Sequence, residues 1–172
     1  MAKVDEAVIG FTVYEDSVER IGISEVTLPE ISNIVQEIEG AGIGGKYEAV
    51  ILGSFESMSL TLNFRTVTKN AVSLCEPRVH NIDLRATQQK RDTANNTVQL
   101  VSLKHVLSVF PKKTSLGKVA TASTSDASGE YSVSYFATYL EGKKVLEIDP
   151  LNYIFFVNGK DYLAEVRRAL GK

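Results

Sequence analysis

Three glycines form the most recognisable chemical motif in this sequence. Gly40, Gly42 and Gly45 match the G-x-G-x-x-G spacing of dinucleotide-binding loops. In such a site a helix opens directly after the glycines, so that its first amide groups meet the pyrophosphate. Here the run from Lys46 to Leu52 follows, and its composition is typical of a strand. The pattern therefore favours a flexible hairpin tip, where glycine permits positive φ, over a cofactor site.

The only cysteine and the two histidines are the remaining candidates for nucleophilic or metal chemistry. Cys75 could in principle pair with His80 or His105 as a thiol and a base. Nothing in their spacing supports such a pair, and two histidines in 172 residues do not predict a metal site. Cys75 is better interpreted as a small apolar residue beside a short helix. The sequence predicts no bound metal and no cofactor.

Other side chains that could bind a partner are better interpreted as structural residues. Tyr131, Tyr135 and Tyr139 could stack on nucleic-acid bases, but aromatic residues with a period of two on a sheet are more often core residues. The glutamates around the glycine turn are expected to be solvated or paired across an interface: Glu30, Glu37, Glu39 and Glu48. No arrangement predicts an active site, so we expect the protein not to be an enzyme.

Composition limits the remaining classes. The 172 residues are enough for one domain with a proper core, which we place at residues 1–172. A formal charge of −2 gives no sign of a nucleic-acid-binding face. A single cysteine rules out an intrachain disulfide, and the first ten residues have no signal-peptide layout. No apolar run approaches the ~20 residues of a membrane helix. We therefore expect a soluble protein made in a reducing compartment.

The first third of the chain predicts strands. Val8–Tyr14 and Glu19–Leu28 are rich in β-branched residues, and Pro29 ends the second strand by removing a hydrogen-bond donor. Ile31–Gly40 has apolar residues at helical spacing, but these residues are all β-branched and the segment runs into a glycine turn. We favour a strand there, which makes the whole of Ile31–Leu52 a protruding hairpin.

Ser57–Arg65 shows the clearest alternation in the sequence. Its apolar residues lie on one face, and short polar residues lie on the other: Ser57, Ser59, Thr61 and Asn63, followed by Arg65. A surface of short polar groups is compatible with an ordinary exposed sheet and equally with the wall of a channel.

The second half of the chain predicts further strands and one helix. Val98–Phe110 is a long strand whose alternation changes phase near Val101 and Ser102, which suggests a bulge. Pro111–Gly129 is rich in Ser, Thr, Ala and Lys and is expected to be a mobile loop. Asp161–Leu170 has a helical apolar stripe, with Asp161 placed to cap its start and Gly171 placed to end it.

Together these elements predict a mainly β (α+β) fold, an antiparallel β-sandwich or barrel with a C-terminal α-helix and a protruding hairpin. Many strands whose edges carry unpaired amides invite further pairing. A chain of this kind without an active site is a candidate for ordered self-assembly.

Several short motifs, in collinear order, carry a family resemblance. In sequence order they are Val26–Ile31, Glu37–Gly45, Tyr139–Lys143, Glu147–Pro150, Asn158–Asp161 and Leu163–Gly171. Together they resemble the major tail tube protein of contractile-tailed bacteriophages. The departures are Ile43, where that family often has Met, and the segment Thr121–Ser128, which does not align.

The resemblance implies a structural subunit of a virion tail, assembled in the host bacterial cytoplasm. Hexameric rings would stack into a tube that lies inside a contractile sheath. The tape-measure protein would fill the tube, and DNA would pass through it without sequence-specific binding. Baseplate and tail terminator proteins would complete the list of partners, with no membrane among them.

The resemblance also gives site hypotheses. The polar face of Ser57–Arg65 would line part of the lumen. The hairpin would contact neighbouring subunits and the next ring through Ile31, Ile34, Ile38, Gly40, Gly42, Ile43, Gly44 and Gly45. The alternatives are a tube subunit of a phage-tail-like bacteriocin or a type VI-like secretion particle and, from another class, a monomeric β-rich binding module.

Overall fold

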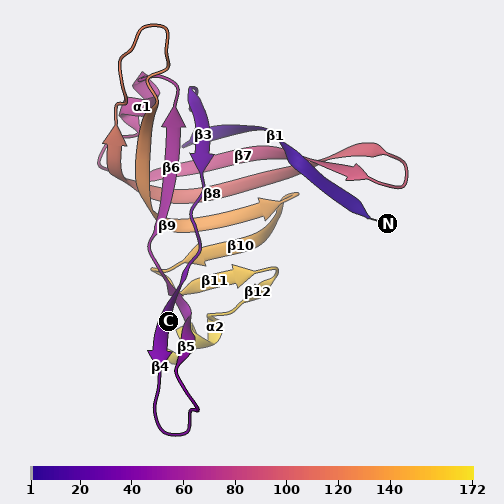
Figure 1. Cartoon of the computed structure of the whole chain (residues 1–172), viewed down its shortest axis with the longest axis vertical. Coiled ribbons are helices and arrows are strands. Elements are labelled where there is room, and N and C mark those ends of the chain that lie inside the picture. Colours follow the sequence, from indigo (N-terminus) through magenta and orange to yellow (C-terminus); the bar gives the residue numbers. More distant parts are fainter. Residues whose placement is uncertain (1) are drawn as a thin grey trace.

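The computed structural model describes residues 2–172, which form a mainly antiparallel β-structure with two short helices (Figure 1). In chain order the elements are β1 (Lys3–Glu15), β2 (Val18–Glu19), β3 (Ile23–Thr27), β4 (Asn33–Ile38), β5 (Tyr47–Phe55), β6 (Met58–Phe64), α1 (Lys69–Ser73), β7 (His80–Asp92), β8 (Thr97–Ser115), β9 (Ala127–Leu140), β10 (Lys143–Asp149), β11 (Ile154–Val157), β12 (Lys160–Asp161) and α2 (Ala164–Ala169). The predicted fold class, mainly antiparallel β with a C-terminal helix and a protruding hairpin, is confirmed.

Two long strands, β8 and β9, bend so that one continuous sheet forms two layers. The first part of β9 pairs with β6, and its last part pairs with β10. β8 pairs with β7 as far as Val109 and continues beside β9 to Ser115. We call β3, β6 and the adjoining parts of β9 and β8 the narrow layer. The wide layer contains β1, β7, β8, β9 and β10. Figure 1 shows β3 and β6 running across the strands of the wide layer.

The apolar core lies between these layers. It contains the inward-facing residues of β6, which are fully buried at Leu60 and Leu62, and residues of the wide layer such as Ile82, Leu107 and Ile148. The alternation predicted for Ser57–Arg65 is confirmed, because every second residue of β6 is buried and the residues between them are half-exposed. Period-two alternation with one face buried fixes the register of this strand.

Bulges in β9 and β8 change which face their side chains occupy. The register between these strands shifts between Ser108 and Val109 and leaves Ser134 as an extra residue on β9. Tyr131 is therefore buried in the core, whereas Tyr135 and Tyr139 lie half-exposed on the outer face of the wide layer. The period of two in the sequence predicts that all three tyrosines share one face, and this prediction is wrong because the extra residue reverses the alternation.

The bulge predicted in β8 and several predicted element boundaries are also wrong. The pairing of β7 with β8 is continuous past Val101 and Ser102, so no bulge occurs there. The segment predicted as one strand, Glu19–Leu28, divides into β2 and β3 around Gly22, whose φ of 96° suits a turn. β8 extends to Ser115, so the loop expected at Pro111–Gly129 spans only residues 116–126.

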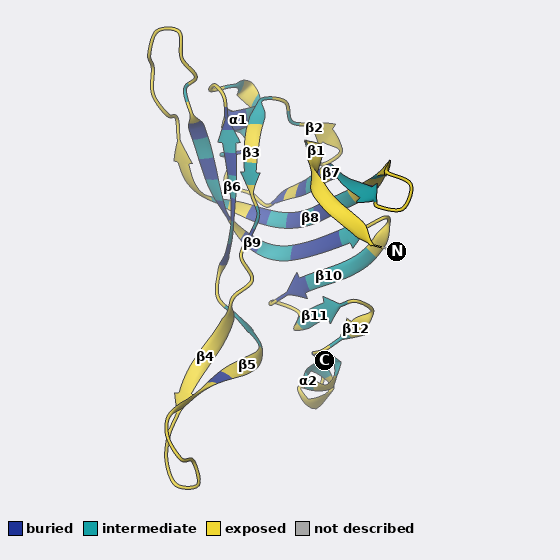
Figure 2. Ribbon diagram, turned by 45° about the vertical axis from the view of Figure 1, so that its right-hand side comes forward, coloured by how far each residue is buried: buried dark blue, intermediate teal, exposed yellow. Residues whose placement is uncertain are grey.

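The β4–β5 hairpin forms a separate two-stranded sheet that stands away from the two layers. The strand interpretation of Ile31–Gly40 is confirmed over Asn33–Ile38. Figure 2 shows that the hairpin is exposed over most of its length. Its tip turns at Gly40 and Gly42, both with positive φ, as the hairpin-tip interpretation predicts.

The C-terminal helix is shorter than predicted. Asp161 lies in β12, and its carboxylate accepts a hydrogen bond from the Leu163 amide and pairs with Arg167. Gly171 ends the helix at a φ of 75°, and its amide and the next one donate to the carbonyls of Arg168 and Arg167. These two nested hydrogen bonds are the pattern of a Schellman C-cap. Within the described residues, no helix is long and apolar enough to cross a membrane.

Candidate assembly surfaces

The polar face of β6 lies on the side of the narrow layer that faces away from the core. Ser59, Thr61 and Asn63 are half-exposed on the strand, while Ser57 and Arg65 are exposed just outside its ends. The residues directly opposite them on the neighbouring strands are also polar: Glu25, Thr27, Ser128, Glu130 and Ser132. The structure thus brings the predicted residues together into one polar face across three strands.

This face carries charges that the alternation of β6 alone did not reveal. The Lys112 ammonium lies 2.9 Å from a Glu130 carboxylate oxygen and donates a hydrogen bond of 3.0 Å to the Ser59 hydroxyl. The hydrogen bond from Lys112 lowers the pKa of Glu130, so this carboxylate is ionised at neutral pH. Lys112 is the residue left over at the second bulge of β8. Its place on this face could not be read from the sequence, because alternation does not persist through a bulge.

The narrow layer has two free edges. β3 pairs only with β6, and β8 beyond Val109 pairs only with β9. Unpaired edges of this kind are templates for pairing with another chain. The β3 edge carries the exposed Glu25, and the β8 edge carries Lys112 and Lys113. The two edges therefore have opposite charge.

The hairpin exposes apolar side chains because no second layer covers it. All the residues predicted to contact other subunits lie on or beside it and are exposed: Ile31, Ile34, Ile38, Gly40, Gly42, Ile43, Gly44 and Gly45. The four isoleucines are 37–41 % exposed. An isolated two-stranded hairpin is marginally stable in water. This segment is thus a candidate for burial against another molecule, and its contact role stays a prediction.

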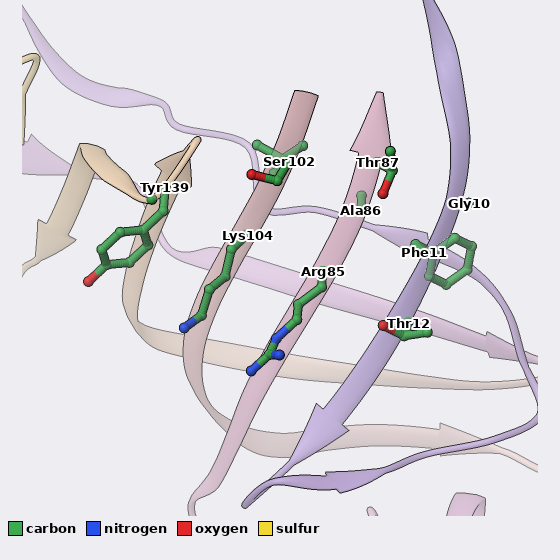
Figure 3. A pocket seen from close by; sticks show the side chains of 11 residues that line it. Gly10, Phe11, Thr12, Arg85, Ala86, Thr87, Ser102, Lys104 and Tyr139 are labelled. Atoms are coloured by element: carbon green, nitrogen blue, oxygen red, sulfur yellow. The ribbon is translucent and has the colours of Figure 1, made fainter. Parts of the chain in front are cut away.

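A cleft of about 860 Å³ lies on the outer face of the wide layer (Figure 3). The side chains of Arg85 and Lys104 extend side by side from β7 and β8, with Tyr139 beside them on β9. The Lys104 ammonium lies 5.6 Å from the centre of the Tyr139 ring. Sequence reasoning did not single out this site, because its residues come from strands far apart in the chain.

A buried ionic cluster fastens the end of β1 to the start of β7. The Glu15 side chain has no solvent exposure and pairs with Arg20 at 2.6 Å, with Arg78 at 2.8 Å and with His80. The second ring nitrogen of His80 lies 2.9 Å from the Glu76 carbonyl oxygen. Both ring nitrogens of His80 therefore face oxygen atoms, one from the Glu15 carboxylate and one from the Glu76 backbone.

The cluster keeps Glu15 ionised although it is buried. Burial by itself would raise the pKa of Glu15, but the hydrogen bonds from His80 and Arg20 outweigh burial and lower that pKa below its usual value. Because each charged group in the cluster has a partner, we assign the cluster a structural role.

Among the described residues, no hydrogen bond joins the Cys75 thiol to either of the histidines considered for nucleophilic chemistry. The Cys75 thiol donates to the Ala71 carbonyl at 3.3 Å, beside α1 as expected. His105 bonds the Thr138 hydroxyl at 2.8 Å, and burial lowers the pKa of His105. Within residues 2–172, no group of three or more His, Cys, Asp or Glu side chains is placed to hold a metal ion.

A bent β-structure with free strand edges, an exposed polar sheet face and an uncovered hairpin defines an assembly subunit. Among solved structures, the chain resembles the sheath/tube terminator of an extracellular contractile injection system (PVC) in its extended state. The TM-score is 0.52 at 14 % identity, covering 76 % of this chain and 94 % of that chain. At this identity the likeness concerns the fold.

Sequence comparison identifies the family. The profile of the phage tail tube protein FII family matches residues 5–171, and the chain belongs to this family. It is also 24 % identical over 149 residues to the tail tube protein of Escherichia phage P2, covering 85 % of each chain. These relatives are structural proteins and not enzymes.

Proposed function

We propose that this chain is the subunit of the inner tube of a contractile phage tail. Six copies close into a ring, and rings stack into a channel that holds the tape-measure protein and later passes DNA. The observation that carries this proposal is the narrow layer, which has two free edges and one polar face turned away from the core.

Ring closure joins the β3 edge of one copy to the β8 edge of the next. The narrow layer contributes four strands, β3, β6, β9 and β8, and each is antiparallel to the next. In the ring, β3 of the next copy follows β8, and these two strands are again antiparallel. An even number of strands per copy therefore allows one uniform barrel without a parallel seam. Closure removes edges that would otherwise pair without limit. The opposite charges of Glu25 and Lys113 favour this orientation. The number six comes from the family resemblance.

The polar face of the narrow layer becomes the lumen wall. Ser57, Ser59, Thr61, Asn63 and Arg65 then face the channel with their cross-strand neighbours. Phosphate affinity comes from Lys and Arg. Lys112 is already paired with Glu130 and Ser59, and this pairing limits its hold on a phosphate. A wall made mainly of short hydroxyl and amide groups suits DNA that must slide, and the exposed Arg65 is the exception on this wall.

The remaining partners follow from the same proposal. The sheath surrounds the tube, and the tail terminator and the baseplate close the ends of the tube. The particle is the tail of a virion assembled in the host bacterial cytoplasm. A subunit of a bacteriocin or secretion tube would have the same fold, and the likeness to an injection-system protein supports this second candidate. Capsid and terminase genes beside its gene would favour the phage tail.

Negative-stain electron microscopy of the purified protein at high concentration tests the ring. We expect rings or tubes with a central hole, together with a rise in mass by light scattering. Glu25→Lys should weaken ring formation, because it places a cation against Lys112 and Lys113 of the neighbour. Glu19→Lys is the matched control, since Glu19 is also an exposed glutamate and lies on β2. A protein that stays monomeric at every concentration would refute the proposal.

A further inference from the structure

The hairpin carries an unfavourable pair of like charges. Glu37 of β4 and Glu48 of β5 are directly opposite each other, and both are exposed. Like charges in directly opposed positions destabilise a strand pair. Lys46 reaches Glu37 at 3.0 Å and Glu39 at 3.5 Å, but within the described chain no salt bridge involves Glu48. One face of the hairpin therefore has three carboxylates and a single cation.

The outer cleft carries the opposite arrangement. Arg85 of β7 and Lys104 of β8 are also directly opposite each other, and they share one carboxylate, Asp83, at 3.2 Å and 3.6 Å. Hydroxyl groups at Thr12, Thr87, Ser102 and Tyr139 also line the cleft, the other lining residues are apolar or glycine, and none of them is acidic. Figure 3 shows Arg85 and Lys104 extending in the same direction from neighbouring strands. The cleft is built to receive anionic side chains.

The two pairs match in spacing as well as in sign. The Cβ atoms of directly opposed residues on antiparallel strands lie about 4.5–5.5 Å apart in any sheet, so two carboxylates and two cations held in this way have the same separation. The hairpin points away from its own body, so the two pairs cannot meet within one copy (Figures 1 and 2).

We infer that the Glu37–Glu48 pair of one copy binds the Arg85–Lys104 pair of a copy in the adjacent ring. This inference rests on the proposed tube and names the surface that receives the hairpin. The hairpin of one copy and the cleft of another are different surfaces, so the contact is heterologous. Such a contact repeats from ring to ring along the stack without closing. The contact neutralises two like-charge pairs at once and covers part of the exposed hairpin.

Charge reversal tests the contact. The double variant Glu37→Lys/Glu48→Lys and the double variant Arg85→Glu/Lys104→Glu should each form rings but stack poorly. We expect the concentration needed for tubes to rise about tenfold or more, because like charges are then juxtaposed across the interface. The quadruple variant, with both pairs reversed, should recover tubes. Reversal of two exposed lysines that do not line the cleft, Lys143→Glu/Lys160→Glu, is the matched control and should leave stacking unchanged.

Tube length by electron microscopy and ring mass by light scattering distinguish the outcomes. Normal tubes from either double variant would overturn the inference and assign the cleft to an acidic segment of another protein. Loss of stacking in both double variants without recovery in the quadruple variant would also overturn it, since the two pairs would then have different partners. Absence of rings from the unaltered protein would instead refute the proposed tube itself.

Discussion

The two-layered body buries its apolar side chains, whereas the hairpin exposes side chains of the same kind. In the body, apolar residues such as Leu60 and Leu62 are fully buried, and the buried Glu15 has a cation on each oxygen. In the hairpin, Val35 and Val50 are 43 % and 62 % exposed although they pair with each other. The body therefore buries its apolar residues and pairs its buried charge, whereas the hairpin leaves apolar side chains exposed to solvent.

The largest loss of stability should follow removal of the buried carboxylate. We expect Glu15→Ala to lower the free energy of unfolding by roughly 3–5 kcal/mol, because the largely buried guanidinium of Arg20 would lose its carboxylate partner. Urea denaturation followed by circular dichroism measures this loss. The control Glu19→Ala removes an exposed carboxylate and should change stability by less than about 0.5 kcal/mol. Equal effects of the two variants would contradict a structural role for the cluster.

A somewhat smaller loss should follow truncation in the core. Leu62→Ala is expected to cost about 3 kcal/mol, because the side chain is fully buried on the inner face of β6 and its removal leaves a cavity. The neighbouring Thr61→Ala lies on the polar face and should leave the urea midpoint almost unchanged. A large effect of Thr61→Ala on the isolated subunit would mean that this face also packs within one copy.

Acid should remove part of the stability that the cluster provides. The pKa of Glu15 is lower in the folded state than its usual value near 4.5, so its contribution is complete above that pH. The contribution is lost as the pH falls through the lowered folded-state pKa. The difference in unfolding free energy between the natural protein and Glu15→Gln should therefore narrow in acid. A difference that stays constant down to the acid transition would disprove the assignment.

The smallest effect on the isolated subunit is expected in the hairpin. Val35→Ser/Val50→Ser should change the free energy of unfolding by no more than about 0.5 kcal/mol, because both side chains are exposed. The same variant should reduce tube yield if the hairpin is buried between copies. Thermal melting of the monomer and sedimentation of tubes give the two readouts. A loss of monomer stability comparable to that of Leu62→Ala would remove the contrast between the two regions.

The sequence alone determined the elements whose signal is local. The alternation of Ser57–Arg65 located β6 and its polar face, and the β-branched run ending in glycines located the hairpin. The pattern of apolar residues and caps near the C-terminus located α2, although its first turn was placed too early. These features depend on residues within about ten positions of one another, where periodicity and turn chemistry act directly.

Only the tertiary structure decided which strands meet and which faces they share. Glu15 and His80 are 65 positions apart, and their contact depends on the pairing of β1 with β7. Extra residues at Ser134 and Lys112 reversed the faces of Tyr135 and Tyr139 and brought a cation onto the polar face. A strand's own sequence does not fix its register against partners that are distant in the chain. For this reason the free edges and the two like-charge pairs became visible only in the folded molecule.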